Sequence, residues 1–465
     1  MPEYQTPGVY IDEIPKLPPV INSVETAIPA FIGYTEKASL IEKDDLLLKP
    51  YCISSMLEFE RYFGFAVPEA SLEVNFDLGN PRRVNVTGKV KRQATSKFLM
   101  YYSIQLFYAN GGGACFITSV GSYSGTAGQI MATDLKSGLE EVAKIDEVTL
   151  ISFPDGLNLP TASDYYNLYR QALKQCGELQ DRFAVMDVWI DPNSTIDNIR
   201  VLRDFYFENH QELKHGATYY PRVFTSIDYN YSDESLVRIN GISGAGTLAE
   251  LKNLNRTWYF LAKNAITNID MLLPASSGVI GQYVTVDNIK GVWKAPANVG
   301  INACVRPEKI ITDNEQAALN TDSISGISVN AVRFLPGRGP AIIWGARTLA
   351  GNDNEWRYVP VRRFVNMVGE STRKATEPFV FEINDKNTWV KVKAMIENYL
   401  TILWRTGALM GNTPREAFFV HVGMGETMTA LDILEGRMIV EFGMAVVRPA
   451  EFVILRFMHK MISES

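Results

Sequence analysis

Both ends of this chain are β-prone stretches bounded by prolines, and this pattern constrains any fold that the chain can adopt. Five prolines fall within the first 22 residues, around the run Val9-Tyr10-Ile11. Near the other end, Phe452-Val453-Ile454-Leu455 follows Pro449. Because prolines interrupt helices and central strands, we interpret 1–22 and 446–465 as extended arms outside a domain core. At about 3.3 Å per residue, the first arm could span about 70 Å and reach a neighbouring molecule.

Composition limits the class of protein and its partners. The chain has 465 residues, of which 46% are hydrophobic and 21% are charged, so we expect a folded protein of two or three domains. Its 45 Lys and Arg against 52 Asp and Glu give a net charge of −7, which argues against nucleic acid as a partner. The sequence shows no leader and no apolar run of about 18 residues, so we expect the protein to stay in the cytoplasm when it is made, with no direct membrane insertion.

The common catalytic and metal-binding patterns are not matched. The phosphate-binding motif Gly-x-x-x-x-Gly-Lys-Ser/Thr does not occur. His210 and His215 are five residues apart, which does not place two zinc ligands on one face of a helix. Asp187 and Asp191 flank the end of a predicted strand, where a hydrolase could hold a carboxylate pair, although Asp-Pro-Asn is also an ordinary turn. We therefore expect a protein that is not an enzyme, with no catalytic, cofactor-binding or metal site, and keep a carboxylate hydrolase of α/β fold as an alternative.

Sequence periodicity divides the chain between the arms into three further segments. The first, 23–120, has a mixed α+β pattern and a polar, basic surface insert at 70–96. In the second, 121–302, strand-like and helix-like runs alternate, which predicts an outer α/β domain with three layers. The third is 303–445, a mixed α+β domain. Strands are expected at 115–120, 148–153, 183–189 and 219–224, and helices at 98–108 and after Thr161.

Two long helices are predicted in the third segment. In one of them, apolar residues recur at helical spacing, which predicts a buried face. These residues are Trp389, Val392, Ile396, Tyr399 and Leu403. The other helix spans 360–375 and carries a cluster of cations, which is either a binding face or a solvated face. The cations are Arg362, Arg363, Arg373 and Lys374.

A series of short motifs follows in order along nearly the whole chain. The most specific is Trp293-Lys294-Ala295-Pro296-Ala297-Asn298. The others include Tyr4-Gln5-Thr6-Pro7-Gly8-Val9-Tyr10, Asp181-Arg182-Phe183-Ala184, Trp344-Gly345-Ala346-Arg347, Tyr358-Val359-Pro360-Val361-Arg362-Arg363 and Arg448-Pro449-Ala450-Glu451-Phe452. Together they resemble the contractile tail sheath family, which includes phage tail sheaths, type VI secretion sheaths and the sheaths of extracellular contractile injection systems. Since the chain is much shorter than the largest phage sheaths, it is most similar to a compact injection-system sheath.

This resemblance implies a fold of α/β and α+β class. A three-layer α/β middle domain would be joined to a mixed α+β tube-proximal domain built from N- and C-terminal parts, with extended β-strand arms at both termini. Val9, Tyr10 and Ile11 of one arm, and Phe452, Val453, Ile454 and Leu455 of the other, would pair with the sheets of neighbouring subunits. The residues themselves support this pairing, because exposed β-prone ends are an aggregation hazard unless a partner strand covers them.

The resemblance also implies partners and a mechanism. Subunits would stack as six-subunit rings in a helical polymer around an inner tube protein, together with baseplate and terminal cap proteins and, in some particles, sister sheath proteins. The extended sheath would store energy and contract without a cofactor, in a phage tail-like particle that is either released or anchored at the envelope. We hypothesise that Arg362, Arg363, Arg373 and Lys374 face an acidic tube surface. An inner tube or baseplate structural protein of the same machine is the main alternative.

Overall fold

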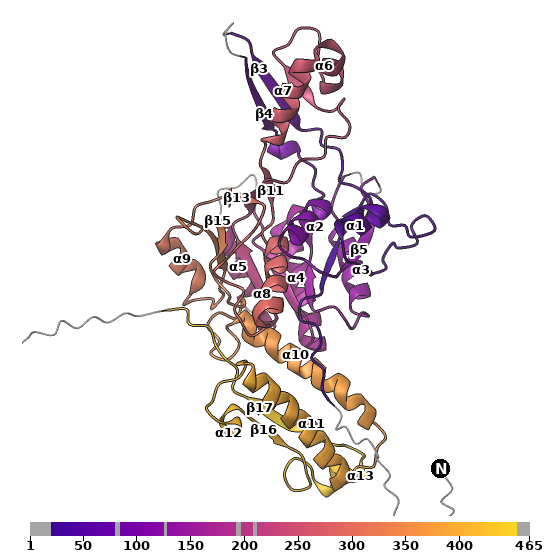
Figure 1. Ribbon diagram of the computed structural model, residues 1–465, viewed down its shortest axis with the longest axis vertical. Coiled ribbons are helices and arrows are strands. Elements are labelled where there is room, and N and C mark those ends of the chain that lie inside the picture. Colours follow the sequence, from indigo (N-terminus) through magenta and orange to yellow (C-terminus); the bar gives the residue numbers. More distant parts are fainter. Residues whose placement is uncertain (1–19, 80–83, 125–127, 192–196, 208–211, 453–465) are drawn as a thin grey trace, which may run out of the picture. The chain divides into compact units, whose positions relative to one another are not determined.

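The computed structural model describes residues 20–79, 84–124, 128–191, 197–207 and 212–452 (Figure 1). These residues form two compact units. The large unit contains the described residues from 25 to 367 together with 448–452, and the small unit contains 20–24 and 368–447. The chain passes from one unit to the other after Val24, after Met367 and after Val447. None of the described helices is both long enough and apolar enough to span a membrane.

A nine-stranded sheet organises the large unit. Its strand order is β12-β15-β14-β8-β7-β6-β1-β5-β2. The six strands from β14 to β5 run parallel, and antiparallel strands lie at both margins. The strands are β1 (Pro29–Thr35), β2 (Tyr51–Ile53), β5 (Cys115–Ser122), β6 (Leu150–Ser152), β7 (Phe183–Asp187), β8 (Gly216–Tyr220), β12 (Val299–Gly300), β14 (Asn330–Leu335) and β15 (Gly339–Ile343).

Helices cover both faces of this sheet, so the arrangement has three layers (Figure 1). Along β7, Phe183 and Val185 belong to one apolar cluster, while Ala184 and Met186 belong to the other. This alternation follows from the two-residue period of a strand that is buried on both faces. One cluster includes α2 (Met100–Ala109) and α8 (Ser276–Lys290). The other includes α3 (Ala132–Val142), α4 (Ala162–Leu179) and α5 (Asn198–Tyr206).

Smaller elements complete the large unit. The insert at 70–96 forms a hairpin, as predicted for a surface insert, and β10 adds to it as a third strand. This sheet consists of β3 (Leu72–Asp77), β4 (Asn85–Val90) and β10 (Arg238–Asn240), next to α6 (Leu248–Leu254) and α7 (Arg256–Thr267). A third sheet contains β9 (Val223–Thr225), β11 (Met271–Leu273) and β13 (Cys304–Pro307). Further helices are α1 (Met56–Phe63), α9 (Asp313–Asn320), η1 (Arg92–Ala94), η2 (Pro154–Asn158) and η3 (Leu213–His215).

The small unit consists of helices and a two-stranded sheet. The chain enters it within α10 (Val359–Thr376). Its principal helix is α11 (Lys386–Arg405), in which Val392, Ile396, Tyr399 and Leu403 are buried, as the helical spacing predicts, whereas Trp389 is only partly buried. The sheet pairs β16 (Phe418–His421) with β17 (Glu441–Met444) in antiparallel register. The remaining elements are η4 (Glu377–Phe379), α12 (Pro414–Ala417) and α13 (Ala430–Leu434).

The fold class is α/β with α+β parts, as expected, but the division along the chain differs from the predicted segments. One sheet joins β1 and β5, from 23–120, with β6 to β8, from 121–302, and with β14 and β15, from 303–445. The single strand predicted at 219–224 is in fact parts of two strands, β8 and β9, which belong to different sheets. The division at Pro221 has a physical reason, because proline has no N–H group to donate to a strand ladder.

Candidate assembly interface

The predicted arm residues lie almost wholly outside the described part of the chain. Val9, Tyr10, Ile11, Val453, Ile454 and Leu455 are not among the described residues. Phe452 is the last described residue, and its side chain is 73% exposed. The structure therefore shows where each arm leaves the body of the subunit.

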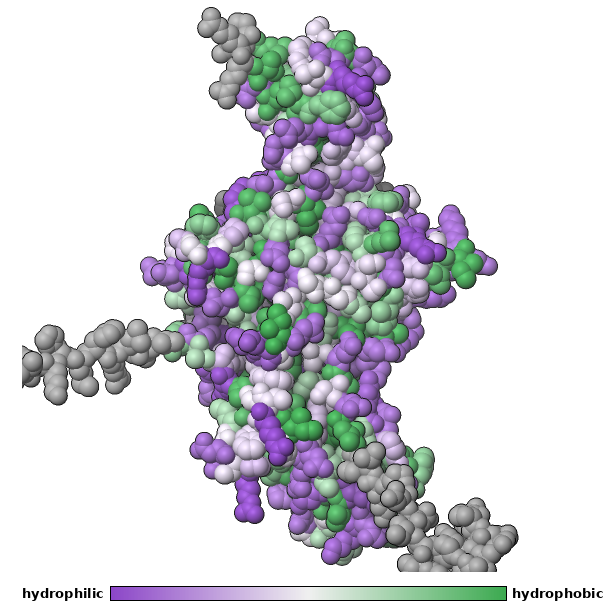
Figure 2. All heavy atoms as spheres, in the orientation of Figure 1, coloured by the Kyte–Doolittle hydropathy of each residue, from purple (hydrophilic) through white to green (hydrophobic). Residues whose placement is uncertain are grey.

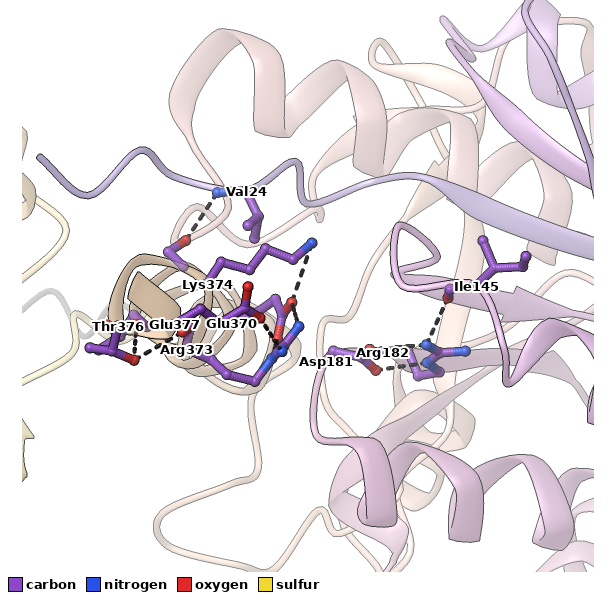
Figure 3. Close-up of polar contacts among 11 residues, drawn as sticks. Val24, Ile145, Asp181, Arg182, Glu370, Arg373, Lys374, Thr376 and Glu377 are labelled. Carbon is purple, nitrogen blue, oxygen red and sulfur yellow. Dashed lines mark hydrogen bonds and ion pairs between the residues drawn. The ribbon is translucent and has the colours of Figure 1, made fainter. Parts of the chain in front are cut away.

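The N-terminal arm leaves from the small unit. The hydroxyl groups of Ser23 and Tyr399 lie 3.0 Å apart, at hydrogen-bond distance. The backbone N–H of Val24 donates to Oγ of Ser371 at 3.0 Å, a contact drawn in Figure 3. Ile21 is also buried. Ser23 and Val24, which directly follow the arm, are thus fixed to α11 and α10.

The small unit offers an incomplete sheet and a groove. Among the described residues, β16 and β17 pair only with each other, so both strands have an outer edge. A groove of about 850 Å³ lies beside β17. Its wall includes Thr372, Phe379, Ile383, Ile396, Val440 and Phe442. Unpaired strand edges next to apolar side chains are the features that an added strand requires.

Large apolar side chains are also exposed on the small unit. The loop after η4 carries three of them, Val380, Phe381 and Ile383, and Phe381 has a positive φ of 71°. Leu431 and Leu434 are exposed on α13. Apolar and polar residues alternate over the face of the molecule shown in Figure 2. Apolar groups that are exposed in clusters are typical of surfaces that bind another protein.

Two of the four predicted tube-contacting cations are buried in the large unit. Arg363 forms an ion pair with Asp287 at 2.6 Å, in which both side chains are at most 4% exposed. Its guanidinium also donates to the carbonyl oxygen of Thr26 at 2.9 Å. Arg362 donates to Asn366 at 2.7 Å and lies over the ring of Trp356. Burial lowers the pKa of Arg362 to about 10. The expectation of an exposed cluster therefore does not hold for Arg362 and Arg363.

The other two cations lie at the surface of the small unit. Arg373 contacts Glu370 at 2.6 Å and Glu377 at 2.9 Å, and Lys374 contacts Glu370 at 3.3 Å. Figure 3 shows both cations turned toward Glu370. These ion pairs join residues three or four positions apart, within α10 for Glu370 and at the start of η4 for Glu377, so they are local pairs at the surface. Both cations remain accessible to a partner.

The Arg182 motif has a structural role in the large unit. The Arg182 side chain is 1% exposed and forms an ion pair with Asp181 at 2.7 Å. Its guanidinium donates to the carbonyl oxygens of Val142 and Ile145, each at 3.0 Å, and Figure 3 shows the contact with Ile145. These carbonyl groups come at and just after the end of α3, where a helix leaves such groups without partners within the helix. The motif therefore joins α3 to the start of β7.

The two members of the candidate carboxylate pair lie in different surroundings. Asp187 is buried and accepts hydrogen bonds from the backbone N–H groups of Ala275 at 2.8 Å and Ser276 at 3.1 Å, where α8 begins. Burial raises its pKa to about 6. Asp191 follows β7 and is partly exposed. His215 is buried, and its burial, followed by the charges of Arg362 and Lys214, lowers its pKa to about 3. His210 lies outside the described residues.

A second buried carboxylate has the same structural role at α2. Asp155 accepts hydrogen bonds from the N–H groups of Tyr34 at 2.7 Å, Leu99 at 2.5 Å and Met100 at 3.0 Å. Asp155 and Asp187 thus accept hydrogen bonds from backbone N–H groups at the N-termini of two helices on the same face of the sheet, although burial outweighs these bonds and raises the pKa of both carboxyl groups. Among the described residues, no group of three or more His, Cys, Asp or Glu side chains could hold a metal ion.

Asp155 is expected to make stability depend on pH. Burial raises its pKa to about 7, so between the unfolded value of about 4 and pH 7 the folded state binds more protons than the unfolded state. Its contribution to the free energy of unfolding is then complete below pH 4 and lost as the pH rises through 7. We expect a slope of up to about 1.4 kcal/mol per pH unit between pH 5 and 7, with stability higher at the lower pH.

Urea unfolding at several pH values measures this slope. The substitution Asp155→Asn should reduce it, because the titrating group is removed. Asp313→Asn, at an exposed carboxylate of α9, is the matched control and should leave the slope unchanged. An equal slope in the wild-type protein and the Asp155→Asn variant would assign the dependence to other groups.

Comparison with known proteins places these features in a family. Residues 351–459 match the model of the phage tail sheath C-terminal domain. The tail sheath protein of Vibrio phage KVP40 is 23% identical over 137 residues, which cover 30% of this chain and 20% of the phage protein. The chain thus spans about a fifth of the length of that curated relative.

Solved structures match over nearly the full length. A chain of the anti-feeding prophage helical sheath in its contracted state is 27% identical, with a TM-score of 0.66, over 98% of this chain and 100% of that chain. The PVC sheath complex of an extracellular contractile injection system, also contracted, gives 27% identity and a TM-score of 0.65 over 99% of both chains. The anti-feeding prophage baseplate gives 27% identity and a TM-score of 0.65 over 99% of this chain and 100% of that chain. On these matches, the chain is similar to contractile sheath subunits over nearly its whole length, and its residues 351–459 match the phage tail sheath C-terminal domain.

Proposed function

We propose that this protein is the structural subunit of a contractile sheath that polymerises around an inner tube. Each arm would add a strand to a sheet of a neighbouring subunit. The observation that supports this most directly is the edge of the β16–β17 sheet, which no other described strand covers and which lies beside an apolar groove, in a chain whose two ends are β-prone. Strand addition supplies main-chain hydrogen bonds, which do not depend on the orientation of whole domains.

The same joints suit a sheath that contracts. Prolines next to each β-prone run separate it from the body of the subunit, so a strand joint can persist while subunits rotate. Energy would be stored in the subunit contacts of the extended state and released when new contacts form. The buried carboxylates Asp187 and Asp155 accept backbone hydrogen bonds at helix N-termini, which is a structural role.

The partners that follow are further copies of this chain in six-subunit rings, an inner tube protein, and baseplate and cap proteins. One of the similar solved structures is a baseplate with imposed 6-fold symmetry, which supports rings of six subunits. Similarity to the contracted PVC sheath supports an extracellular particle. We propose that the subunits are made and assembled in the bacterial cytoplasm before the particle acts on a target envelope.

Electron microscopy of the purified protein in negative stain tests the proposal. Long striated cylinders are expected. A discrete monomer or small oligomer that turns over a substrate would instead support an α/β hydrolase. Narrow smooth tubes, or flat assemblies without cylinders, would support the alternative of an inner tube or baseplate protein.

Arg373 and Lys374 are the proposed contacts with the tube, because Arg362 and Arg363 have little accessible surface. Reversal of both charges, Arg373→Glu with Lys374→Glu, should weaken attraction to an acidic tube and lower the yield of extended particles several-fold. The two new glutamates also face Glu370, so the helix loses local ion pairs. The yield of extended and contracted particles, counted in micrographs, measures the effect.

The control for this variant must lose similar helical ion pairs elsewhere. Lys136 and Lys174, on α3 and α4, each lie near a glutamate four residues later, at 3.8 and 3.6 Å. Lys136→Glu with Lys174→Glu should therefore cost comparable local contacts and leave the tube contact intact. Extended particles at the wild-type yield in the Arg373→Glu, Lys374→Glu variant would rule out this tube contact.

A further inference from the structure

The root of the C-terminal arm is attached to the large unit by one buried arginine. The chain leaves the small unit after Val447, and Arg448 to Phe452 belong to the large unit. Within this segment, the Glu451 carboxylate accepts two hydrogen bonds from Arg347. Arg347 Nε donates to Oε1 at 2.8 Å, and Arg347 Nη2 donates to Oε2 at 2.6 Å. Two parallel bonds of this kind fix the direction of the carboxylate as well as its distance.

Neighbouring groups strengthen this attachment. The Tyr358 hydroxyl donates to Oε2 of Glu451 at 3.3 Å. Nη1 of Arg448 donates to the carbonyl oxygen of Asn354 at 2.9 Å. Because of the hydrogen bond to Glu451, followed by the attraction of its charge, the pKa of Arg347 is raised. The segment from Arg448 to Glu451, which has no helix or strand, is thus connected to Arg347, Asn354 and Tyr358 of the large unit.

Arg347 is also held by contacts that do not involve Glu451. Its side chain is 5% exposed, and Nη1 donates to the carbonyl oxygen of Asn320 at 3.1 Å. The Asn330 side chain forms two hydrogen bonds with the Arg347 backbone, each at 2.8 Å. Asn330 is the first residue of β14, in the nine-stranded sheet. The sheet therefore positions the guanidinium, and the guanidinium positions Glu451.

The boundary between the fixed and the exposed chain is sharp. The Glu451 side chain is 20% exposed, whereas the next residue, Phe452, is 73% exposed. A chain end without a partner gains little from a buried ion pair, because it can fray at small cost. A chain end that is pulled by a neighbouring subunit needs such a fixed point immediately before the segment that pairs.

We propose that Arg347 and Glu451 form an anchor that transmits the pull on the C-terminal arm to the nine-stranded sheet. This inference rests on the proposed function, since the pull comes from a neighbouring subunit. The N-terminal arm differs, because Ser23 and Val24 attach its root to the small unit. The two arms of one subunit are therefore rooted in different units, and Glu451 is a positioning residue for the C-terminal arm only.

The substitutions Glu451→Ala and Glu451→Gln test the anchor in the full chain. Arg347 is left unchanged, because its contacts with Asn320 and Asn330 also support the fold. First, chymotrypsin cleavage after Phe452 is followed by mass spectrometry in the unassembled subunit, with cleavage after Phe457 as the reference. Loss of the charged pair should raise the ratio of cleavage after Phe452 to cleavage after Phe457 roughly tenfold in Glu451→Ala. Glu451→Gln keeps the shape and should give a smaller rise.

Second, the urea resistance of assembled cylinders is compared between variants. Cylinders of Glu451→Ala should be absent or should break at lower urea concentration than wild-type cylinders. Glu42→Ala, at an exposed glutamate of the large unit, is the control and should match the wild type in both assays. An unchanged cleavage ratio overturns the anchor, and so does a raised ratio with cylinders of wild-type resistance. Absence of cylinders in the wild-type protein would contradict the proposed function instead, which keeps the two failures distinct.

Discussion

A chain that carries both Val453→Pro and Leu455→Pro is expected to fold and to form no sheath cylinders. Proline has no backbone N–H and its ring excludes it from a central strand, so two prolines remove alternate donors from the run that should pair with a neighbour. Every subunit in the polymer would lose the same joint. We expect the amount of sedimentable polymer to fall at least tenfold, with the circular dichroism of the subunit unchanged.

Sedimentation and negative-stain microscopy measure this effect together. Ser463→Pro is the matched control, because it adds a proline to the same terminal segment outside the apolar run. This control should polymerise like the wild type. Cylinders of normal length and yield in the double proline variant would show that the C-terminal arm is not a strand joint, and the proposed mechanism would lose one of its two connections.

The second large effect concerns Arg363, whose ion pair with Asp287 is almost fully buried. The substitution Arg363→Met leaves the Asp287 carboxylate buried without its cation. The removal of one partner from a buried pair costs about 3 to 5 kcal/mol, because the remaining charge is poorly solvated. Thr26 loses a hydrogen bond at the same time, since its carbonyl oxygen accepts from Arg363. We expect the large unit to unfold at markedly lower urea concentration.

Tryptophan fluorescence during urea unfolding reports this change, because Trp293 contacts Phe364, the residue after Arg363. Arg373→Met, at an exposed arginine of the same helix, should change stability by less than about 1 kcal/mol. The double variant Arg363→Met with Asp287→Leu should be more stable than Arg363→Met alone, since no uncompensated charge remains. If Arg363→Met and Arg373→Met lower the free energy of unfolding by the same amount, the buried ion pair contributes no more to stability than the contacts of the exposed arginine.

Local patterns in the sequence predicted many elements of the fold. The helix expected at 98–108 is α2, and the strand expected at 115–120 is β5. The apolar spacing from Val392 to Leu403 identified the buried face of α11. Helical and strand periods are short, so a few consecutive residues carry the whole signal. The ordered motifs also indicated the sheath family, which the comparisons confirm.

Pairings between distant residues could not be predicted in this way. The position of β1 between β5 and β6, and that of β14 beside β8, determine that three predicted segments share one sheet. The side of α10 that is buried was also undetermined, because the helical spacing of Arg362, Arg363, Arg373 and Lys374 is equally compatible with a solvated face. Only the location of Asp287, 76 residues before Arg363, determines that Arg363 is internal.

The sequence alone determined the β-prone ends, the helical and strand periods, and the motifs that indicate a sheath, because each is a property of neighbouring residues. The tertiary structure decided which charges are buried and where each arm is rooted. Arg347 and Glu451 are 104 residues apart and meet beside β14, whose first residue, Asn330, also binds the backbone of Arg347. The physical reason is that burial and ion pairing depend on distances in space, which a linear pattern does not specify.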